Sequence, residues 1–161
     1  LVLQEQPNSL SVLVPCGDAH REQVKVSFFG AIGFGRVGEP ELTEDGALLA
    51  ASLDDLMATK VKVVLQRVEA KDYRDVAAMV TAGISLAKGL SSARQLYGRA
   101  FQPSESLKAL VYFEGGDLDT LTDTEKRALV DSVSSVRDLP KVALLSMSLG
   151  VEATAPPSLL R

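Results

Sequence analysis

A run of charged residues near the middle of the chain has types and spacing that could bind an anion or a nucleotide. Its members are Lys60, Arg67, Lys71, Asp72 and Asp75. Seven residues advance a helix by almost two turns, so we expect Lys60 and Arg67 within about 20° of each other on one helical face. Lys60 has apolar neighbours at i−4 and i+4, so its ammonium must extend to solvent or meet an anion. Asp72 and Asp75 lie one turn apart on the next predicted helix.

Two interpretations of this charged run are open at the level of spacing. In the first, the carboxylates approach Lys60 and Arg67 across a tight helical hairpin and form an ion-pair cluster that determines how the helices pack. In the second, the same groups line a ligand site. Spacing alone favours the ion-pair cluster, because structural ion pairs are common in proteins.

Three other patterns resemble ligand-binding or metal-binding sites but are better explained without such a function. Residues 33–38 match GxGxxG, but acids and a proline follow where a dinucleotide-binding helix would have to begin, so we predict a loop. Residues 115–119, GGDLD, resemble a DxD metal motif, but glycine and aspartate between two helices are typical of a turn. Cys16 and His20 are the single cysteine and the single histidine, and no third ligand accompanies them, so we predict no metal site there.

Composition limits the class of protein that can carry this charged run. The 161 residues, 46% of them hydrophobic, suit one globular domain with a real core. A net charge of −4 argues against a broad nucleic-acid surface but leaves room for a local basic cleft. There is no signal peptide and no apolar run of about 18 residues, so we expect a soluble, cytoplasmic protein with no membrane contact.

The apolar periodicity changes along the chain from that of strands to that of helices. Alternation predicts an antiparallel pair of strands at 10–14 and 24–28, with a short third strand at 48–50 after a loop. Helical periodicity begins at Ser52 and predicts a bundle, whose members are expected at 52–68, 73–83, 85–98, 105–113 and 122–136. Ser52 with Asp55 and Thr122 with Glu125 resemble capping boxes, and Ser85 is predicted to cap the third helix. The first helix is expected to carry an apolar stripe of Leu53, Leu56, Met57, Val61, Val64, Leu65 and Val68. Residues 142–149 could be strand or helix. The expected fold is therefore α+β, a small antiparallel sheet (1–51) followed by a helical bundle (52–140) and an extension (141–161).

The charged helical region resembles the AbiEii/AbiGii toxin family of nucleotidyltransferase-like proteins. The sequence there is SLDDLMATKVKVVLQRVEAKDYRDVAAMVTAG. The residues that match the family's spaced motif are Asp55, Leu56, Ala58, Lys60, Arg67, Lys71, Asp72 and Asp75. The stretches SLAKGLSSARQLYG and LKALVYFEGGDL also resemble the family's helical half, and VKVSFFG resembles the last strand of its catalytic sheet. The likeness extends over about residues 10–136.

This resemblance implies a polymerase-β-like nucleotidyltransferase fold with a helical bundle in a bacterial toxin paired with an antitoxin. Such proteins bind a nucleoside triphosphate, GTP or another, with magnesium and transfer a nucleotide to an acceptor, tRNA in some members. By this likeness Lys60 would hold the triphosphate, and Arg67 and Asp72 would shape the nucleotide pocket. Asp75 and Lys71 would support these residues without contacting the nucleotide. The chemistry suits these residue types, because phosphoryl transfer depends mainly on positioning and charge neutralisation.

The sequence departs from the family where the metal should bind. The family's DxD turn would precede Leu1, and Ser27 occupies the place where a third acid is often found. Two magnesium ions cannot be held without carboxylates. We therefore expect no catalytic and no metal-binding residue here, and an inactive chain that is the C-terminal portion of a longer protein or a degenerate relative. The alternative is a non-catalytic interaction module with a structural ion-pair cluster, and an uncovered sheet would favour a homo-oligomer.

Overall fold

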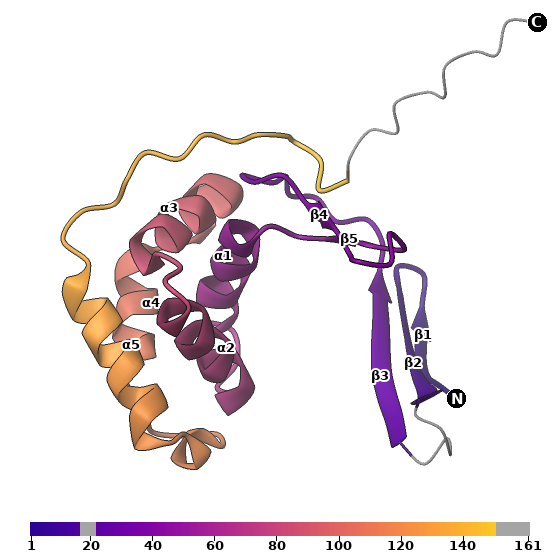
Figure 1. Cartoon of the computed structure of the whole chain (residues 1–161), viewed down its shortest axis with the longest axis horizontal. Helices are drawn as coiled ribbons and strands as arrows, with labels where there is room; N and C mark the ends of the chain where they lie inside the picture. The colour runs from indigo at the N-terminus through magenta and orange to yellow at the C-terminus, as the bar shows by residue number, and fades with distance from the viewer. Residues whose placement is uncertain (17–21, 151–161) are drawn as a thin grey trace, which may run out of the picture. The chain divides into compact units, whose positions relative to one another are not determined.

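The computed structural model describes residues 1–16 and 22–150 of the chain. The chain divides into two compact units, Leu1–Gly33 and Phe34–Arg161. The first is a three-stranded antiparallel sheet, and the second contains a short strand pair and the α-helices (Figure 1). The predicted α+β class is confirmed, while the division at residues 51 and 140 stays a prediction.

The N-terminal unit is a meander of β1 (Val2–Gln6), β2 (Ser9–Cys16) and β3 (Glu22–Phe29), hydrogen-bonded in that order. The predicted antiparallel pairing of the second and third strands is confirmed. The structure adds β1, which the sequence did not predict because its residues are mixed in polarity and all exposed. The second strand also continues past Pro15, which pairs in register with Gln23 although proline has no N–H to donate.

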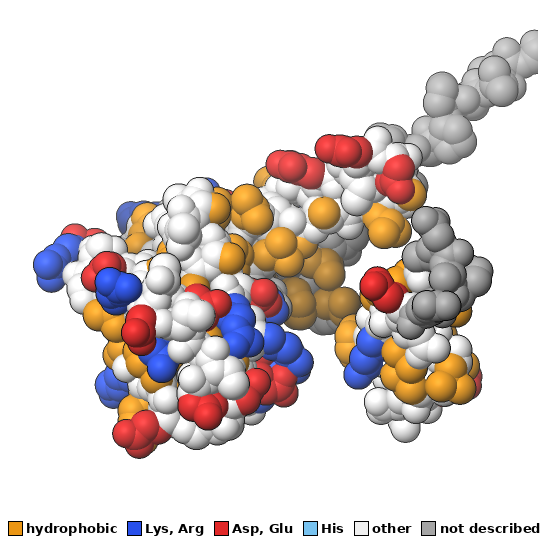
Figure 2. Space-filling view, turned by 60° about the horizontal axis from the view of Figure 1, so that its bottom comes forward, with side chains coloured by type: hydrophobic (Ala, Val, Ile, Leu, Met, Phe, Trp, Pro, Cys, Tyr) orange, Lys and Arg blue, Asp and Glu red, His pale blue; other side chains and the backbone are white. Residues whose placement is uncertain are grey.

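One face of this sheet is apolar and largely uncovered within its own unit. Register places Leu10 opposite Phe28 and Val14 opposite Val24, so every second residue of β2 and β3 contributes to the same face. Phe28 is 57% exposed. Hydrophobic side chains are visible on this unit in Figure 2. The strands therefore alternate in polarity as those of a half-buried sheet do. Among the described residues of this unit, no other element covers the apolar face.

The second unit begins with a loop and a short ladder between β4 (Glu41–Leu42) and β5 (Leu49–Ala50). The predicted third strand is thus present, but it pairs with β4 instead of joining the first sheet. Residues 142–149 form neither a strand nor a helix. Their backbone makes one isolated bridge, between Ser146 and Arg36.

Five α-helices form the bundle of the second unit, and α1 packs on α3 while α2 packs on α5 (Figure 1). Predicted caps at Ser52, Ser85 and Thr122 are confirmed, each accepting a backbone N–H, and Thr122 with Glu125 completes a capping box. None of the helices in the described part of the chain has the length and apolar character needed to cross a bilayer. The helices are α1 (Leu53–Val63), α2 (Ala70–Thr81), α3 (Leu86–Tyr97), α4 (Pro103–Leu110) and α5 (Asp123–Ser135).

The first helix is shorter than its apolar periodicity predicts. It ends at Val63, because the next residues tighten into turns in which Leu65 N–H bonds to the Lys62 carbonyl and Gln66 N–H to the Val63 carbonyl. The predicted stripe through residue 68 is therefore wrong in part. The buried face consists of Met57, Ala58, Val61 and Val64, whereas four members of the stripe are exposed, namely Leu53, Leu56, Leu65 and Val68.

The GGDLD segment is the turn that the sequence predicts. Gly115 and Gly116 adopt φ of 91° and 54°, and a 3₁₀ turn, η2 (Leu118–Thr120), follows. The Asp117 carboxylate accepts the N–H of Ala70 at 2.6 Å. This side chain therefore caps the first turn of α2.

Two glycines with positive φ provide a matched test of this turn. A Cβ at Gly116 would lie 2.0 Å from the Val68 carbonyl oxygen, whereas a Cβ at Gly83 (φ 87°) would meet no atom within 4 Å. We expect Gly83→Ala to cost about 1–2 kcal/mol, the backbone penalty alone. Gly116→Ala should cost clearly more, because the Val68 backbone must move as well. Urea unfolding followed by helical circular dichroism measures both, and equal costs would contradict the close approach.

Candidate functional site

Asp72 is the centre of the charged cluster and is fully buried, with 0% of its surface exposed. Its Oδ1 accepts a hydrogen bond from Lys60 Nζ at 3.0 Å. Arg67 binds the same carboxylate side-on, with Nε donating to Oδ2 at 2.8 Å and Nη2 donating to Oδ1 at 3.2 Å. Both carboxylate oxygens are therefore satisfied by cationic donors, which is the condition under which a buried charge is tolerated.

Three different segments supply these side chains. Lys60 lies in the last turns of α1, Asp72 in the first turn of α2, and Arg67 in the connection between them. The prediction that Lys60 and Arg67 share one helical face is wrong, because α1 ends at Val63. The two cations nevertheless meet, since the turn after Val63 returns Arg67 toward the N-terminus of α2.

Asp75 and Lys71 occupy the outer part of the cluster, and of these two only Asp75 contacts a cation that is bound to Asp72. Asp75 pairs with Lys60 and is half exposed. Lys71 pairs instead with Glu69, 2.5 Å away, and Glu69 also lies 3.8 Å from Arg67 Nε. Glu69 was not predicted from the sequence, although its position two residues after Arg67 and two residues before Lys71 could have indicated a place in the cluster.

The pKa values of Asp72, Lys60 and Arg67 are shifted in the directions that favour their charged forms. Burial raises the pKa of the Asp72 carboxyl, but hydrogen bonds from Arg67 and Lys60 outweigh burial and keep that pKa below its ordinary value. For Lys60, burial lowers the pKa of the ammonium, and its bonds to Asp75 and Asp72 more than compensate, so the pKa is raised. The pKa of Arg67 is raised chiefly by its hydrogen bond to Asp72.

A second buried carboxylate, Asp55, holds the glycine-rich loop that precedes the helices. Asp55 is 5% exposed, and it accepts the Val37 N–H at 2.8 Å and the Gly38 N–H at 3.0 Å. The predicted capping box is half correct: Ser52 Oγ accepts the Asp55 N–H, while the Asp55 carboxylate bonds to the Ser52 hydroxyl and the loop. The motif residue Asp55 thus fastens the loop to the start of α1.

Two glycines of the GxGxxG pattern, Gly35 and Gly38, have a packing role in this loop. A Cβ at Gly38 would lie 2.2 Å from Ser52 Oγ, and a Cβ at Gly35 would lie 1.9 Å from the Ser146 carbonyl oxygen. No helix follows Gly38, because the next regular element is the two-residue strand β4. The prediction of a loop is confirmed, and the geometry of a dinucleotide site is not present here.

Metal ligands do not converge in the part of the chain that the structure describes. Residues 1–16 and 22–150 contain no group of three or more His, Cys, Asp or Glu side chains that could hold a metal ion. Cys16 lies at the end of β2 as a free thiol, and His20 lies outside the described residues. The described residues therefore do not fit a magnesium ion by themselves.

Comparison with known families gives one finding. The model of a family described as "Nucleotidyl transferase AbiEii toxin, Type IV TA system" matches residues 3–144. The match extends over most of the chain and includes both units and the whole charged cluster. No curated protein and no solved structure matches the chain.

Replacing Asp72 tests whether the buried carboxylate holds the two cations. We expect Asp72→Asn to reduce the free energy of unfolding by about 2–3 kcal/mol, because Lys60 and Arg67 lose a charged partner while the site keeps its shape. Asp131→Asn removes an exposed carboxylate from α5 and is the matched control, with an expected change within about 0.5 kcal/mol. Chemical denaturation measures both, and similar losses in the two variants would contradict a central role for Asp72.

The cost of Asp72→Asn should also depend on pH in a defined direction. The pKa of Asp72 is lowered by folding, so the stability due to its ionised form is complete above the unfolded pKa and is lost as the pH falls through the folded pKa. The difference between wild type and variant should be constant near neutral pH and shrink below about pH 4. A difference that grows in acid would contradict this assignment.

Proposed function

Because the chain belongs to the AbiEii family of nucleotidyl transferase toxins of type IV toxin–antitoxin systems, we propose that it supplies the helical half of a nucleoside-triphosphate pocket. The observation that carries this proposal is the convergence of Lys60 and Arg67 on one buried carboxylate. A triphosphate needs cations held in place before it binds, and the two ion pairs provide that positioning.

Each of the three central residues has a defined part in this proposal. Asp72 orients both cations and does not itself meet the ligand, because it is fully buried. The Arg67 side chain is 44% exposed and uses one edge of its guanidinium for Asp72, which leaves the other N–H groups for phosphate or ribose oxygens. Lys60, 26% exposed, offers the remaining N–H of its ammonium. Asp75 and Lys71 support the cluster from its outer part.

We propose further that residues 1–161 alone transfer no nucleotide, as a partial or degenerate member of the family. Magnesium, where the family uses it, neutralises phosphate charge, but the described residues do not hold it, so no step here depends on a metal. In support, the DLD sequence lies in a turn, where Asp117 caps the first turn of α2. Incubation with labelled triphosphates, magnesium and total tRNA should leave no label on the RNA, and transfer of label would refute the proposal.

The same family membership supports proposals about partners. Toxins of such systems act opposite an antitoxin, so we propose an antitoxin protein as the partner of this chain. For a full-length form we propose GTP or another triphosphate with magnesium as the donor and tRNA as the acceptor, in a bacterial cytoplasm. The apolar face of the N-terminal sheet supports self-association as a further proposal.

A second function, a non-catalytic interaction module with a structural ion-pair cluster, is favoured by one observation. Lys60 and Arg67 carry two positive charges, and Asp72 and Asp75 carry two negative charges in contact with them. The cluster is therefore neutral as a whole, and both cations already have partners. In this alternative the cluster determines only how α1, the connection and α2 pack.

Removing the charge of Lys60 separates the two functions. We expect Lys60→Met to weaken binding of a nucleoside triphosphate about tenfold or more, as loss of a charge-assisted contact does. Lys108→Met is the matched control, because Lys108 has only an exposed pair with Glu105 on α4. Isothermal titration calorimetry with each triphosphate, in the presence and absence of magnesium, measures the affinity, and thermal unfolding of the same samples measures stability.

The combination of affinity and stability decides between the proposals. Lower affinity with stability close to wild type supports the nucleotide pocket. Lower stability together with no triphosphate binding by the wild-type chain supports the ion-pair cluster as purely structural. Unchanged affinity in Lys60→Met rejects the role proposed for Lys60.

A further inference from the structure

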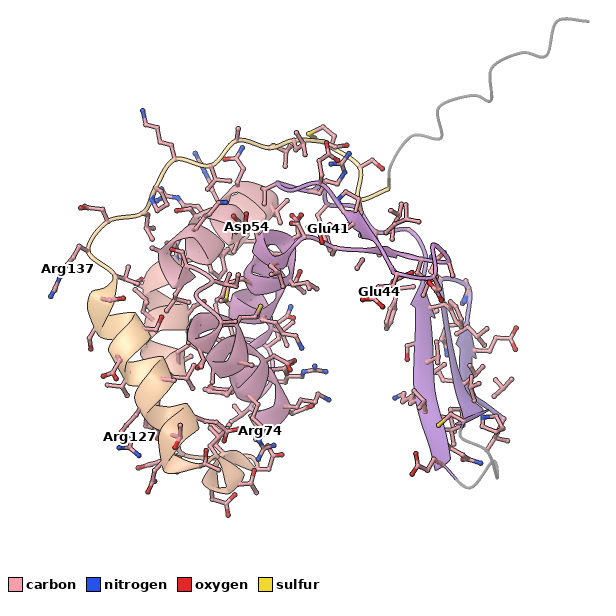
Figure 3. The ribbon with its side chains drawn as sticks, viewed as in Figure 1. Glu41, Glu44, Asp54, Arg74, Arg127 and Arg137 are labelled. Carbon is pink, nitrogen blue, oxygen red and sulfur yellow. The ribbon has the colours of Figure 1, made fainter. Side chains whose placement is uncertain are left out.

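The chain after α5 forms an extended strap on the helical unit, which comprises residues 137–149. It runs from the end of α5 to the loop before β4 (Figure 1), and the Arg137 side chain at its start points away from the helices (Figure 3). Exposure alternates along the strap, since Leu144 is half-buried while its neighbours Ala143 and Leu145 are exposed. An extended chain that lies on a surface has this period of two.

One backbone bridge fastens the strap to the loop before β4. The Arg36 N–H donates to the Ser146 carbonyl at 3.0 Å, and the Arg36 carbonyl accepts the N–H groups of Leu145 at 2.9 Å and of Ser146 at 3.2 Å. Within residues 1–16 and 22–150, no side chain of the strap forms a hydrogen bond or an ion pair with another segment. The described hydrogen bonds that hold the strap therefore all lie at a single point.

The packing beneath the strap is loose. A cavity of about 560 Å³ lies between residues 139–142 and the C-terminal half of α3. The fully buried core of the bundle comes from residues 57–129, and of the strap only Leu139 packs against it, partly buried. Lifting the strap would thus expose little apolar surface, and segments held by so few contacts open at a low free energy.

The loop that the strap contacts is also held by α1. Val37 and Gly38, the two residues after Arg36, donate their N–H groups to the Asp55 carboxylate. At the end of the strap, Leu149 lines a cavity of about 240 Å³ together with Arg36 and Asp55. The strap and α1 therefore hold consecutive residues of one loop, and the strap supplies part of the wall of the cavity beside Asp55.

We propose that the strap is a displaceable clamp on the loop 34–38. In the closed state, which is the one described above, the strap fixes Arg36 and closes one wall of the cavity beside Asp55. In the open state the bridge to Arg36 breaks, Leu149 leaves the cavity wall and the loop is held by Asp55, while the helical bundle stays folded. The clamp is separate from the Lys60 cluster and does not rest on the function proposed for that cluster.

Gly35 offers a substitution that acts on the strap directly. A Cβ at Gly35 would overlap the Ser146 carbonyl oxygen, and Gly35 has no positive φ, so alanine suits the loop backbone but clashes with the strap. Gly33 also has no positive φ, and a Cβ there would meet no atom within 4 Å. Gly33→Ala is therefore the matched control for Gly35→Ala.

Hydrogen exchange of the full chain, followed by NMR, tests the clamp. In the wild type the amides of Arg36, Leu145 and Ser146 should share one protection factor, lower than that of amides in the middle of α3. Gly35→Ala should lower the protection of Arg36 about tenfold or more without changing that of α3, and Gly33→Ala should change neither. Bridge amides as protected as those of α3, or equal effects of the two substitutions, would overturn the proposal.

Thiol labelling with a maleimide distinguishes opening of the strap from loosening of the loop alone. In a Cys16→Ser background, Leu144→Cys places a thiol on the half-buried side of the strap and Leu145→Cys places one on its exposed side. Adding Gly35→Ala should speed the labelling of Leu144→Cys severalfold and leave that of Leu145→Cys unchanged, whereas Gly33→Ala should alter neither. Unchanged labelling of Leu144→Cys in the presence of Gly35→Ala would show that the strap stays closed and would reject the clamp.

Discussion

The buried carboxylate of Asp72 is the constraint on which the charged region depends. A carboxylate without solvent is tolerated only when cations and hydrogen-bond donors surround it, and here Lys60 and Arg67 satisfy both oxygens. These cations come from a helix and from the connection after it, so this one side chain ties α1 and the connection to the first turn of α2. Any function of this surface, nucleotide binding or recognition of a protein, has to use cations that Asp72 has already oriented.

Local features of this chain could be predicted from sequence, because local chemistry determines them. The capping box at Thr122 and Glu125 and the turn at Gly115 and Gly116 depend only on neighbouring residues. Arg67 shows where such reasoning fails. The apolar pattern continues past Val63, although the helix does not, and the turn after Val63 brings Arg67 to Asp72. The structure therefore brings Lys60, Arg67, Asp72 and Asp75 together, but by a geometry other than the one predicted.

The two buried carboxylates of the family motif have similar physical roles at different places. Asp55 accepts two backbone N–H groups of the preceding loop, and Asp72 accepts cationic side chains from the preceding helix and connection. The sequence could not reveal that Asp55 binds the loop. Asp55 lies three residues after Ser52, and a capping box already explains an acid at that position. The GxGxxG pattern was equally ambiguous, and its Gly38 is required by close packing against Ser52. Long-range partners of short motifs are thus the part of the site that only three-dimensional structure supplies.

The cap on α2 has a consequence for the order in which this protein folds. Asp117 closes the first turn of α2 across a separation of 47 residues. Contacts of such long range form late, because the intervening chain must first be ordered. The first turn of α2 also carries Asp72, so this long-range cap lies beside a cluster whose own ion pairs all fall within residues 60–75. A nascent chain that has emerged only through α3 therefore has the residues of the cluster but not the cap on the helix that carries Asp72.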